Sequence, residues 1–314
     1  MGKQTNTSGS QFGGDWTKQK LLVIEGYLKS YATALKYLNV KKIYVDAFAG
    51  SGRTEIKEKE ESGILQLNMF DIDEEHKDSK IVKPTVSVLD GSAILSLKCD
   101  FDEYYFIELD EERLAELEIR IKNDYPEKME RVHLINGNCN EVLKGLISGI
   151  SVVDRCLMFL DPYALELEWA TLEAISKKGV IDLWYLFPFS ALTRSIPKDG
   201  SKIYRNEKTI NLILGTEDWK TTLYEATGQK DLWKEEEEFK RKEYDKLIPF
   251  IMGRFKEIFP YVFNEPIILR NEEKRVPLFL LSFMMTNHSK RAINLASKLV
   301  KGIKTKLDNS YGNN

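Results

Sequence analysis

The sequence predicts an α/β protein built on a doubly wound, mostly parallel sheet. Short apolar runs alternate with segments of helical periodicity, which is the pattern of successive βαβ units. Four of the runs end in polar residues, and open sheets of this class bind ligands at the carboxyl ends of their strands. The run at 180–187 is apolar except for Asp182, as expected for a strand that helices cover on both faces.

The first strand ends in a glycine turn. Asp46 closes the run Ile-Tyr-Val-Asp, and Gly50 and Gly52 follow in Ala-Phe-Ala-Gly-Ser-Gly. Glycine lets the backbone turn tightly and approach a ligand closely. Glu55 replaces the third glycine of a dinucleotide fingerprint, and Arg53 replaces the lysine of a Walker loop. An acid beside the turn disfavours phosphate and favours a ligand with positive charge, such as S-adenosylmethionine.

Three further strands end in residues that suit a nucleoside ligand. The run Tyr-Tyr-Phe-Ile-Glu ends at Glu108, and an acid at that place accepts hydrogen bonds from ribose hydroxyls. The run Val-His-Leu-Ile-Asn-Gly-Asn ends at Asn138, which is placed to contact an adenine edge. The run Arg-Cys-Leu-Met-Phe-Leu ends in Asp161-Pro162-Tyr163.

In this order the motifs resemble those of class I S-adenosylmethionine-dependent methyltransferases. More narrowly, residues 15–306 resemble the three-Cys-motif partner protein (TcmP) family, whose name refers to cysteines of a partner. That resemblance also rests on Trp16-Thr17-x-x-Lys20, Gly91-Ser92 and Thr286-Asn287-His288. It implies a Rossmann-like, seven-stranded sheet with five parallel strands and a terminal antiparallel hairpin. It implies S-adenosylmethionine as cofactor, held by Asp46, Phe48, Ala49, Gly50, Gly52, Glu108 and Asn138.

The end of the fourth strand suggests the chemistry. Asp161-Pro162-Tyr163 resembles the Asp-Pro-Pro-Tyr of methyltransferases that act on the amino group of adenine. There the acid and a proline carbonyl accept the amino hydrogens, and the aromatic ring stacks on the flipped base. This chain continues with Ala164 after a single proline, which puts specificity for adenine N6 in doubt. The alternative is that Asp161-Pro162 only ends a strand and has no role in function.

Two functions therefore stay open. The first is a methyltransferase that acts on nucleic acid, with a base amino group as acceptor. The second is a cofactor-binding partner subunit, inactive alone, of an iron–sulfur or radical-type three-Cys-motif protein encoded nearby. Two basic stretches, Arg194–Lys208 and Lys290–Lys306, suit DNA or RNA, although the net charge of −3 gives no such signal overall. A basic terminal helix is equally an ordinary solubility feature.

Composition and patterning bound the remaining features. Three scattered cysteines without CxxC spacing predict a reducing cytoplasm, with neither a disulfide nor a metal site. The sequence contains no run of 18 apolar residues, so no membrane span is expected. His288 is expected to be structural. Residues 53–90 are expected as a mobile loop, and 188–258 as a helical insertion in which Lys234–Lys246 forms a solvated helix face. The methyltransferase-like core then comprises 15–187 and 259–306, with a disordered leader at 1–14 and a flexible tail at 307–314.

Overall fold

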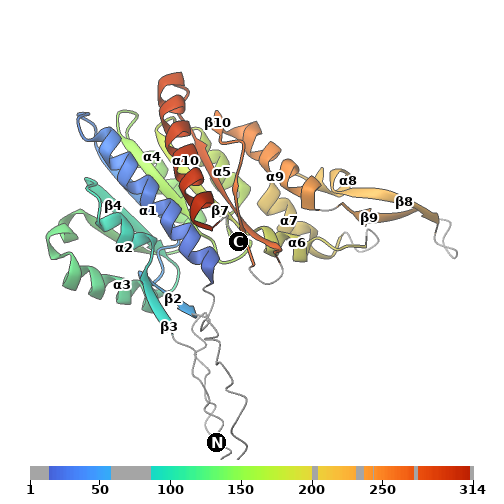
Figure 1. Ribbon diagram of the computed structural model, residues 1–314, viewed down its shortest axis with the longest axis horizontal. Coiled ribbons are helices and arrows are strands. Elements are labelled where there is room, and N and C mark those ends of the chain that lie inside the picture. The colour runs from blue at the N-terminus through green and yellow to red at the C-terminus, as the bar shows by residue number, and fades with distance from the viewer. Residues whose placement is uncertain are drawn as a thin grey trace, which may run out of the picture.

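The protein is built around one central sheet with helices on both faces (Figure 1). The computed structural model describes residues 14–57, 86–199, 204–230, 237–242, 244–271 and 275–311. In these residues the sheet has eight strands, namely β1 (Lys42–Asp46), β4 (Glu103–Glu108), β5 (Val132–Asn136), β6 (Arg155–Leu160), β7 (Ile181–Phe187), β10 (Tyr261–Val262), β11 (Ile267–Arg270) and β12 (Pro277–Met285).

The strand order confirms the predicted Rossmann-like fold. The five strands β5, β4, β1, β6 and β7 pair in parallel in that order, so β1 lies between β4 and β6. Strand β12 runs antiparallel to β7, and both β10 and β11 pair with the other edge of β12. The short β10 and β11 thus share one position, and eight strands fill seven places in the sheet.

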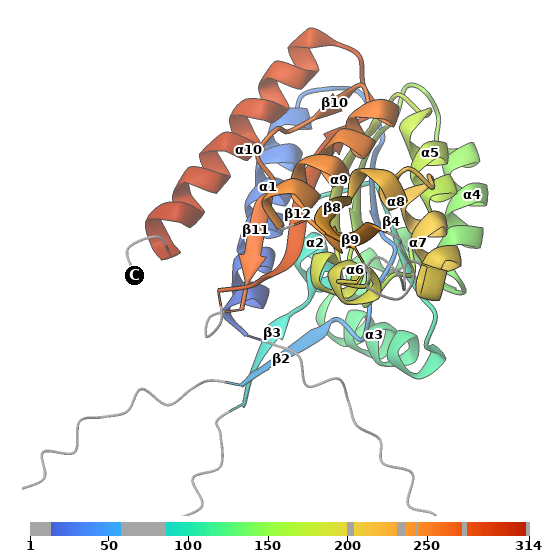
Figure 2. The ribbon, with the colours of Figure 1, turned by 90° about the vertical axis from the view of Figure 1, so that its right-hand side faces the viewer.

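Helices cover the two faces of the sheet in separate layers (Figure 2). Successive strand residues point to opposite faces, so Tyr44 packs in one core and Val45 in the other. The first layer contains α1 (Asp15–Leu35), α2 (Ser92–Leu97), α3 (Glu111–Asp124) and α10 (Lys290–Tyr311), with the 3₁₀ helix η1 (Pro126–Arg131) beside α3. The second contains α4 (Cys139–Gly149), α5 (Trp169–Ser176), α6 (Phe189–Ser195), α7 (Glu207–Leu214), α8 (Trp219–Thr222) and α9 (Tyr244–Ile258).

Side-chain caps start two of the helices at the carboxyl edge of the sheet. The Asp110 carboxylate accepts hydrogen bonds from the backbone N–H groups of Glu112 and Arg113 and so begins α3 directly after β4. Asn138 begins α4 in the same way after β5, through the N–H of Asn140. Such caps satisfy donors that have no partner within the helix. They fix where each chain segment leaves the edge that binds ligands in this fold class.

The predicted loop at 53–90 is wrong at its two ends. Strand β2 (Arg53–Lys57) pairs antiparallel with β3 (Val86–Asp90), and Ile56 is buried. Pairing satisfies the backbone hydrogen-bonding groups of both ends, which polarity alone did not predict. The rest of the predicted loop, 58–85, lies outside the described residues.

The insertion contains a β-ribbon as well as the predicted helices. Strands β8 (Tyr224–Lys230) and β9 (Glu237–Arg241) pair antiparallel and extend away from the central sheet (Figure 1). The helix predicted for Lys234–Lys246 is therefore wrong over Glu237–Arg241, because cross-strand pairing overrides the local charge pattern. The guanidinium of Arg241 donates to the carbonyls of Thr193 and Ile196, which ties the ribbon to α6.

The carboxyl-terminal helix is longer than predicted. Helix α10 continues through the expected tail to Tyr311, because Leu307 is buried and Tyr311 packs against the same core. Residues 1–13 of the expected leader and 312–314 of the tail lie outside the described residues. Cys99, Cys139 and Cys156 are buried and form no disulfide. Among the helices that the structure describes, none has the length and apolar character needed to cross a membrane.

Candidate functional site

Three of the predicted acids meet at the carboxyl edge of the sheet. Strand β1 pairs with β4 on one side and with β6 on the other, so their ends lie next to one another. Asp46 is the last residue of β1, Glu108 is the last of β4, and Asp161 directly follows β6. The glycine turn after Asp46 lies at the same edge, where ligands bind in open α/β sheets.

Gly50 is the open point of the turn. Its φ is +59°, and a Cβ built on it would meet no atom within 4 Å. Its N–H donates to Glu108 Oε2 at 2.8 Å, while the N–H of Asp110 donates to Oε1 at 3.0 Å. Glu108 thereby holds the turn against β4. Each carboxylate oxygen has a second lone pair, so Glu108 can still accept a hydrogen bond from a ligand hydroxyl.

Gly52 packs directly against two helices, and the ligand contact expected for it from the sequence stays a prediction. Its φ is +73°, and a Cβ there would lie 2.8 Å from Leu117 of α3 and 2.9 Å from Ile94 of α2. Its carbonyl accepts hydrogen bonds from the Gly91 N–H at 2.9 Å and from the Arg120 guanidinium at 2.5 Å. Glycine is needed at this position because α2 and α3 pack directly on the backbone.

Asp46 is enclosed beneath the turn. Its side chain has 0% exposure, and it accepts hydrogen bonds from the Phe48 N–H at 3.2 Å and from the Ser92 hydroxyl. Burial raises the pKa of Asp46 to about 7, Asp161 acts in the same direction, and Lys20 opposes them. Asp46 therefore shapes the turn from below. The neighbouring Ala49 is also buried, and its N–H donates to the carbonyl of Ile107 at 3.0 Å, which anchors the turn on β4.

Asp161 forms an ion pair that the sequence analysis did not predict. The ammonium of Lys20, from α1, donates to Asp161 Oδ2 at 2.6 Å. Lys20 is buried, whereas a fifth of the Asp161 side chain remains exposed, at 20%. In the described part of the chain, no hydrogen bond to Oδ1 of this carboxylate is found. Asp161 therefore keeps one oxygen that can accept a hydrogen from a ligand.

The segment after Asp161 is braced from α4. The side-chain oxygen of Asn140 accepts hydrogen bonds from the Glu168 N–H at 3.0 Å and from the Thr171 hydroxyl at 2.8 Å. Within this braced segment Pro162 is buried, and Tyr163 is 67% exposed. The aromatic side chain thus lies on the surface directly beyond the acid, as the predicted stacking role requires.

Asn138 and Leu109 complete the described edge on the side of β5. Asn138 is exposed, but its side-chain oxygen caps α4, so the amide hydrogens are what it can offer a ligand. Leu109 follows Glu108 and is 70% exposed, so its apolar side chain is open to a ligand at this edge. Asn136 fixes this turn by donating to the carbonyls of both Glu108 and Leu109.

Sequence reasoning missed Lys20 and Leu109 as site residues. Lys20 was noted only as part of a motif, yet it falls on the apolar stripe of α1 with Ile24 and Tyr27. A lysine on a buried face needs a partner, and that signal points to a nearby carboxylate. For Leu109, an apolar residue just beyond a strand end was available as a weaker signal.

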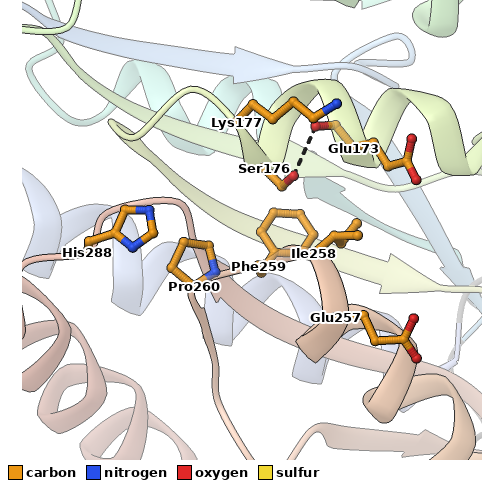
Figure 3. Close-up of a pocket in the computed structure, with 8 residues that line it drawn as sticks. All are labelled: Glu173, Ser176, Lys177, Glu257, Ile258, Phe259, Pro260 and His288. Atoms are coloured by element: carbon orange, nitrogen blue, oxygen red, sulfur yellow. Dashed lines mark hydrogen bonds between the residues drawn. The ribbon is translucent and has the colours of Figure 1, made fainter.

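A separate pocket lies at the opposite edge of the sheet (Figure 3). It has a volume of about 540 Å³ and lies between the ends of α5 and α9, with His288 across from Glu173 and Glu257. His288 follows β12, whose end pairs with the start of β7, so the pocket is far from the glycine turn. The prediction that His288 is structural is not tested by this placement.

The two basic stretches lie in opposite layers. Arg194 is on α6, which packs in the core with α5 and α9, whereas Lys290–Lys306 belong to α10, which packs on α1. They do not form one continuous face. Only α10 lies in the same layer as Lys20.

Comparisons with known proteins give limited support. No family model matches the sequence, and no curated protein sequence matches it. The structure is similar to protein LPL1258 from Legionella pneumophila, at 12% identity over 90% of this chain and 91% of that one, with a TM-score of 0.45. It is also similar to Trm1 from Pyrococcus horikoshii in complex with S-adenosylmethionine, at 9% identity over 92% of this chain and 60% of that one, with a TM-score of 0.39. A putative methyltransferase, yhhF, from Escherichia coli is 13% identical over 52% of this chain and 68% of that one, with a TM-score of 0.29. Because all three scores are below 0.5, the fold assignment rests on the strand order.

Proposed function

We propose that this protein is an S-adenosylmethionine-dependent methyltransferase that acts on nucleic acid, with an amino group of a base as acceptor. The observation that carries the proposal is the arrangement at one edge of the sheet. The open turn at Gly50, the hydroxyl acceptor Glu108 and the amino acceptor Asp161 follow three adjacent parallel strands. Candidate residues for binding the methyl donor and for binding the methyl acceptor thus lie side by side.

The residues present fit the cofactor. The backbone of Gly50 has free space above it, and Glu108 is fixed with lone pairs to spare for ribose hydroxyls. Leu109 offers an exposed apolar side chain, and Asn138 offers amide hydrogens, for the adenine ring. Asp46 and the Asp161–Lys20 ion pair lie near the place expected for a cationic ligand, although the raised pKa of Asp46, about 7, leaves this acid partly protonated at neutral pH. We assign the binding of the adenosyl part to Gly50, Glu108, Leu109 and Asn138.

The bound cofactor would supply an electrophilic methyl group. The protein's own contribution is to hold the acceptor. Asp161 Oδ1 accepts a hydrogen of the amino group and so orients the nitrogen, while the exposed ring of Tyr163 stacks on the base. Orientation and proximity account for much of the rate that a methyl transfer needs.

Helix α10 supports a polyanionic substrate. Its exposed residues include Lys290, Arg291, Lys298 and Lys301, and residues 287–306 contain no acid. The helix runs beside α1 along the outside of the molecule (Figure 2). Burial raises the pKa of its last residue, Tyr311, and the Asp15 carboxylate at the start of α1 acts in the same direction. The two helices are therefore antiparallel: the last turns of α10 lie at the end of α1 that carries Lys20, whereas Lys290 and Arg291 lie at the other end.

Calorimetry and a transfer assay test the proposal. The wild-type protein should bind S-adenosylmethionine and its demethylated product, and should transfer a radiolabelled methyl group to DNA or RNA. Asp161→Ala should abolish transfer and leave cofactor affinity nearly intact, whereas the control Asp218→Ala, at an exposed position on the insertion, should change neither. Transfer that survives in Asp161→Ala would show that this residue is not the amino acceptor.

A salt titration tests the polyanion. Retention of nucleic acid on filters should fall steeply with salt as counterions are released. Replacing Arg291, Lys298 and Lys301 with glutamine should reduce the salt slope by up to about three units if each contacts one phosphate. Binding that does not depend on salt would contradict a nucleic-acid substrate.

The TcmP family and its partner-subunit role remain a second proposal. It is favoured by the ion pair between Lys20 and Asp161, because the predicted acceptor carboxylate is already engaged by a cation. In this case the protein alone should bind the cofactor and show no transfer to any acceptor. Co-expression with a neighbouring three-cysteine protein should then yield a stable complex, and failure to co-purify would count against it.

A further inference from the structure

Lys20 stands out among the described residues because its ammonium lies on the buried face of a helix. It is 7% exposed, and the apolar residues Ile24, Tyr27 and Leu28 follow it on the same stripe of α1. An ammonium in such a place is costly unless it is paired. Its partner is Asp161 Oδ2 at 2.6 Å, across from α1 at the end of β6. The pair is therefore a built contact between the first helix and the candidate acceptor residue.

Aromatic packing fixes the lysine from the other side. The Lys20 ammonium lies 5.7 Å from the centre of the Trp16 ring, within the range of a cation–π contact. Trp16 in turn stacks on Phe279 of β12, with 4.7 Å between ring centres. This chain of contacts spans β12, α1 and β6. It limits the positions that the ammonium can adopt, and with them the orientation of the Asp161 carboxylate.

The same lysine acts on two carboxyl groups, those of Asp161 and Asp46. Asp46 has Tyr44 as a neighbour on its own strand, with the hydroxyl 3.5 Å away, and Ser92 from α2 donates to it. The charged groups that act on Asp46 from other elements are Asp161 and Lys20. Two carboxyl groups at one place hold a proton between them unless a cation compensates. One lysine therefore serves both acids.

We propose that Lys20 is a positioning residue for the methyl transfer: it holds Asp161 through Oδ2 and leaves Oδ1 to the acceptor amino group. The catalytic part of this role rests on the proposed methyltransferase function. The arrangement of charge that it requires belongs to the ligand-free protein and can be measured there.

Removal of the ammonium should couple the two acids. In Lys20→Met, Asp161 and Asp46 lose their common cation, so the pair should retain a proton to higher pH. A proton held by Asp161 would make its carboxyl a poorer acceptor for an amino hydrogen. Methyl transfer should then fall at neutral pH and recover as the pH rises.

Carbon-13 NMR of the aspartate carboxyl groups tests the charge arrangement without any ligand. The higher apparent pKa of the Asp46–Asp161 pair should rise by about one unit or more in Lys20→Met and return toward the wild-type value in Lys20→Arg. The control Lys29→Met, which removes the exposed partner of Glu25 on the same helix, should leave it unchanged. An unchanged titration in folded Lys20→Met would overturn the proposal.

A second variant covers the case in which Lys20→Met does not fold. In Asp161→Asn the lysine remains beside Asp46 without its own partner, so the apparent pKa of Asp46 should fall. A pKa of Asp46 that stays unchanged or rises would show that Lys20 does not serve both acids.

The pH profile of transfer tests the catalytic part. The acidic limb for Lys20→Met should move to higher pH by about the same amount as the NMR titration, and Lys20→Arg should restore the wild-type limb. An unshifted limb together with a shifted NMR titration would overturn the positioning role. If the wild-type protein neither binds the cofactor nor transfers methyl groups, the proposed function fails, while the NMR result still decides whether Lys20 controls the two acids.

Discussion

The two edges of the central sheet each hold an aspartate with a raised pKa, Asp46 fully buried and Asp182 partly buried, and the two have different surroundings. Burial raises the pKa of Asp46, at the end of β1, and of Asp182, at the start of β7, to about 7 in both cases. The Asp182 carboxyl accepts a hydrogen bond from the Tyr27 hydroxyl at 2.8 Å, in a layer of packed aromatic rings. Asp46 instead lies under a turn that opens to the surface at Gly50, and beside the pair of Lys20 and Asp161.

The difference shows that a perturbed carboxyl does not by itself mark a functional site. Both acids owe their raised pKa to the same cause, so the shift cannot distinguish them. What distinguishes Asp46 is the adjoining backbone, which approaches free space, and a second carboxylate with an oxygen to spare. The pocket with His288 lies at the other edge, where the described residues provide no such turn.

The largest expected effect is a loss of folding stability with rising pH, and it should be the same at both edges. A group with a folded pKa of about 7 and an ordinary value near 3.8 binds more protons in the folded state, so its contribution to stability is lost as the pH rises from about 4 to about 7. Over this window each acid should cost up to about 4 kcal/mol. Urea denaturation of Asp182→Asn and Asp46→Asn at several pH values should show the difference from wild type shift in favour of the variant as the pH increases. A difference independent of pH would contradict the raised pKa.

The next effect separates two glycines of the same turn. Gly52→Ala should destabilise the protein by about 3 kcal/mol, because the new methyl group collides with Leu117 and Ile94 at a positive φ. Gly50→Ala meets no atom and should cost only about 1 kcal/mol for its φ. Cofactor affinity should fall in Gly50→Ala out of proportion to its stability. Chemical denaturation and calorimetry on both variants check this, and equal losses of stability would show that the turn is not packed as described.

A third, smaller effect should occur at one edge only. Asp46→Ala should weaken cofactor binding by more than about tenfold, because the turn loses a charge-assisted contact worth about 1.5–3 kcal/mol. Asp182→Asn is the matched control, since it changes an acid with the same raised pKa at the other edge, and its affinity should equal that of wild type. Calorimetry decides the comparison. Equal affinities in wild type and Asp46→Ala would remove Asp46 from the site.

Local sequence patterns were enough for most of the central fold. The apolar strands carry their own signals, and in the structure three of them end at or next to the predicted residues Asp46, Glu108 and Asp161. The β-ribbons at β2–β3 and β8–β9 were missed because pairing between strands decides them, whereas the prediction relied on local polarity and charge. The end of α10 was missed because the burial of Leu307 depends on packing against other parts of the chain.

The candidate site was predicted in its positions more than in its contacts. The rule that parallel strands share a carboxyl edge brings Asp46, Glu108 and Asp161 together from the sequence alone. The burial of Asp46, the bond from Gly50 to Glu108 and the pair with Lys20 depend on how α1 and α2 pack on the sheet. Such contacts between distant segments have no local signature, apart from a lysine on an apolar helix face.

The smallest expected effect belongs to the edge of Asp182. Tyr27→Phe removes the hydroxyl that donates to Asp182 and leaves the ring in its packing with Trp184. Below pH 7 the carboxyl is mostly protonated, and the lost hydrogen bond should cost about 1 kcal/mol. At pH 8 the carboxylate is ionised and a hydrogen bond to it is stronger, so the cost should rise to about 2 kcal/mol. Denaturation at pH 6 and pH 8 measures both values, and calorimetry should find cofactor affinity unchanged. A loss of affinity in Tyr27→Phe would mean that the two edges of the sheet are coupled, so that the acid at the far edge also influences the site at the carboxyl edge.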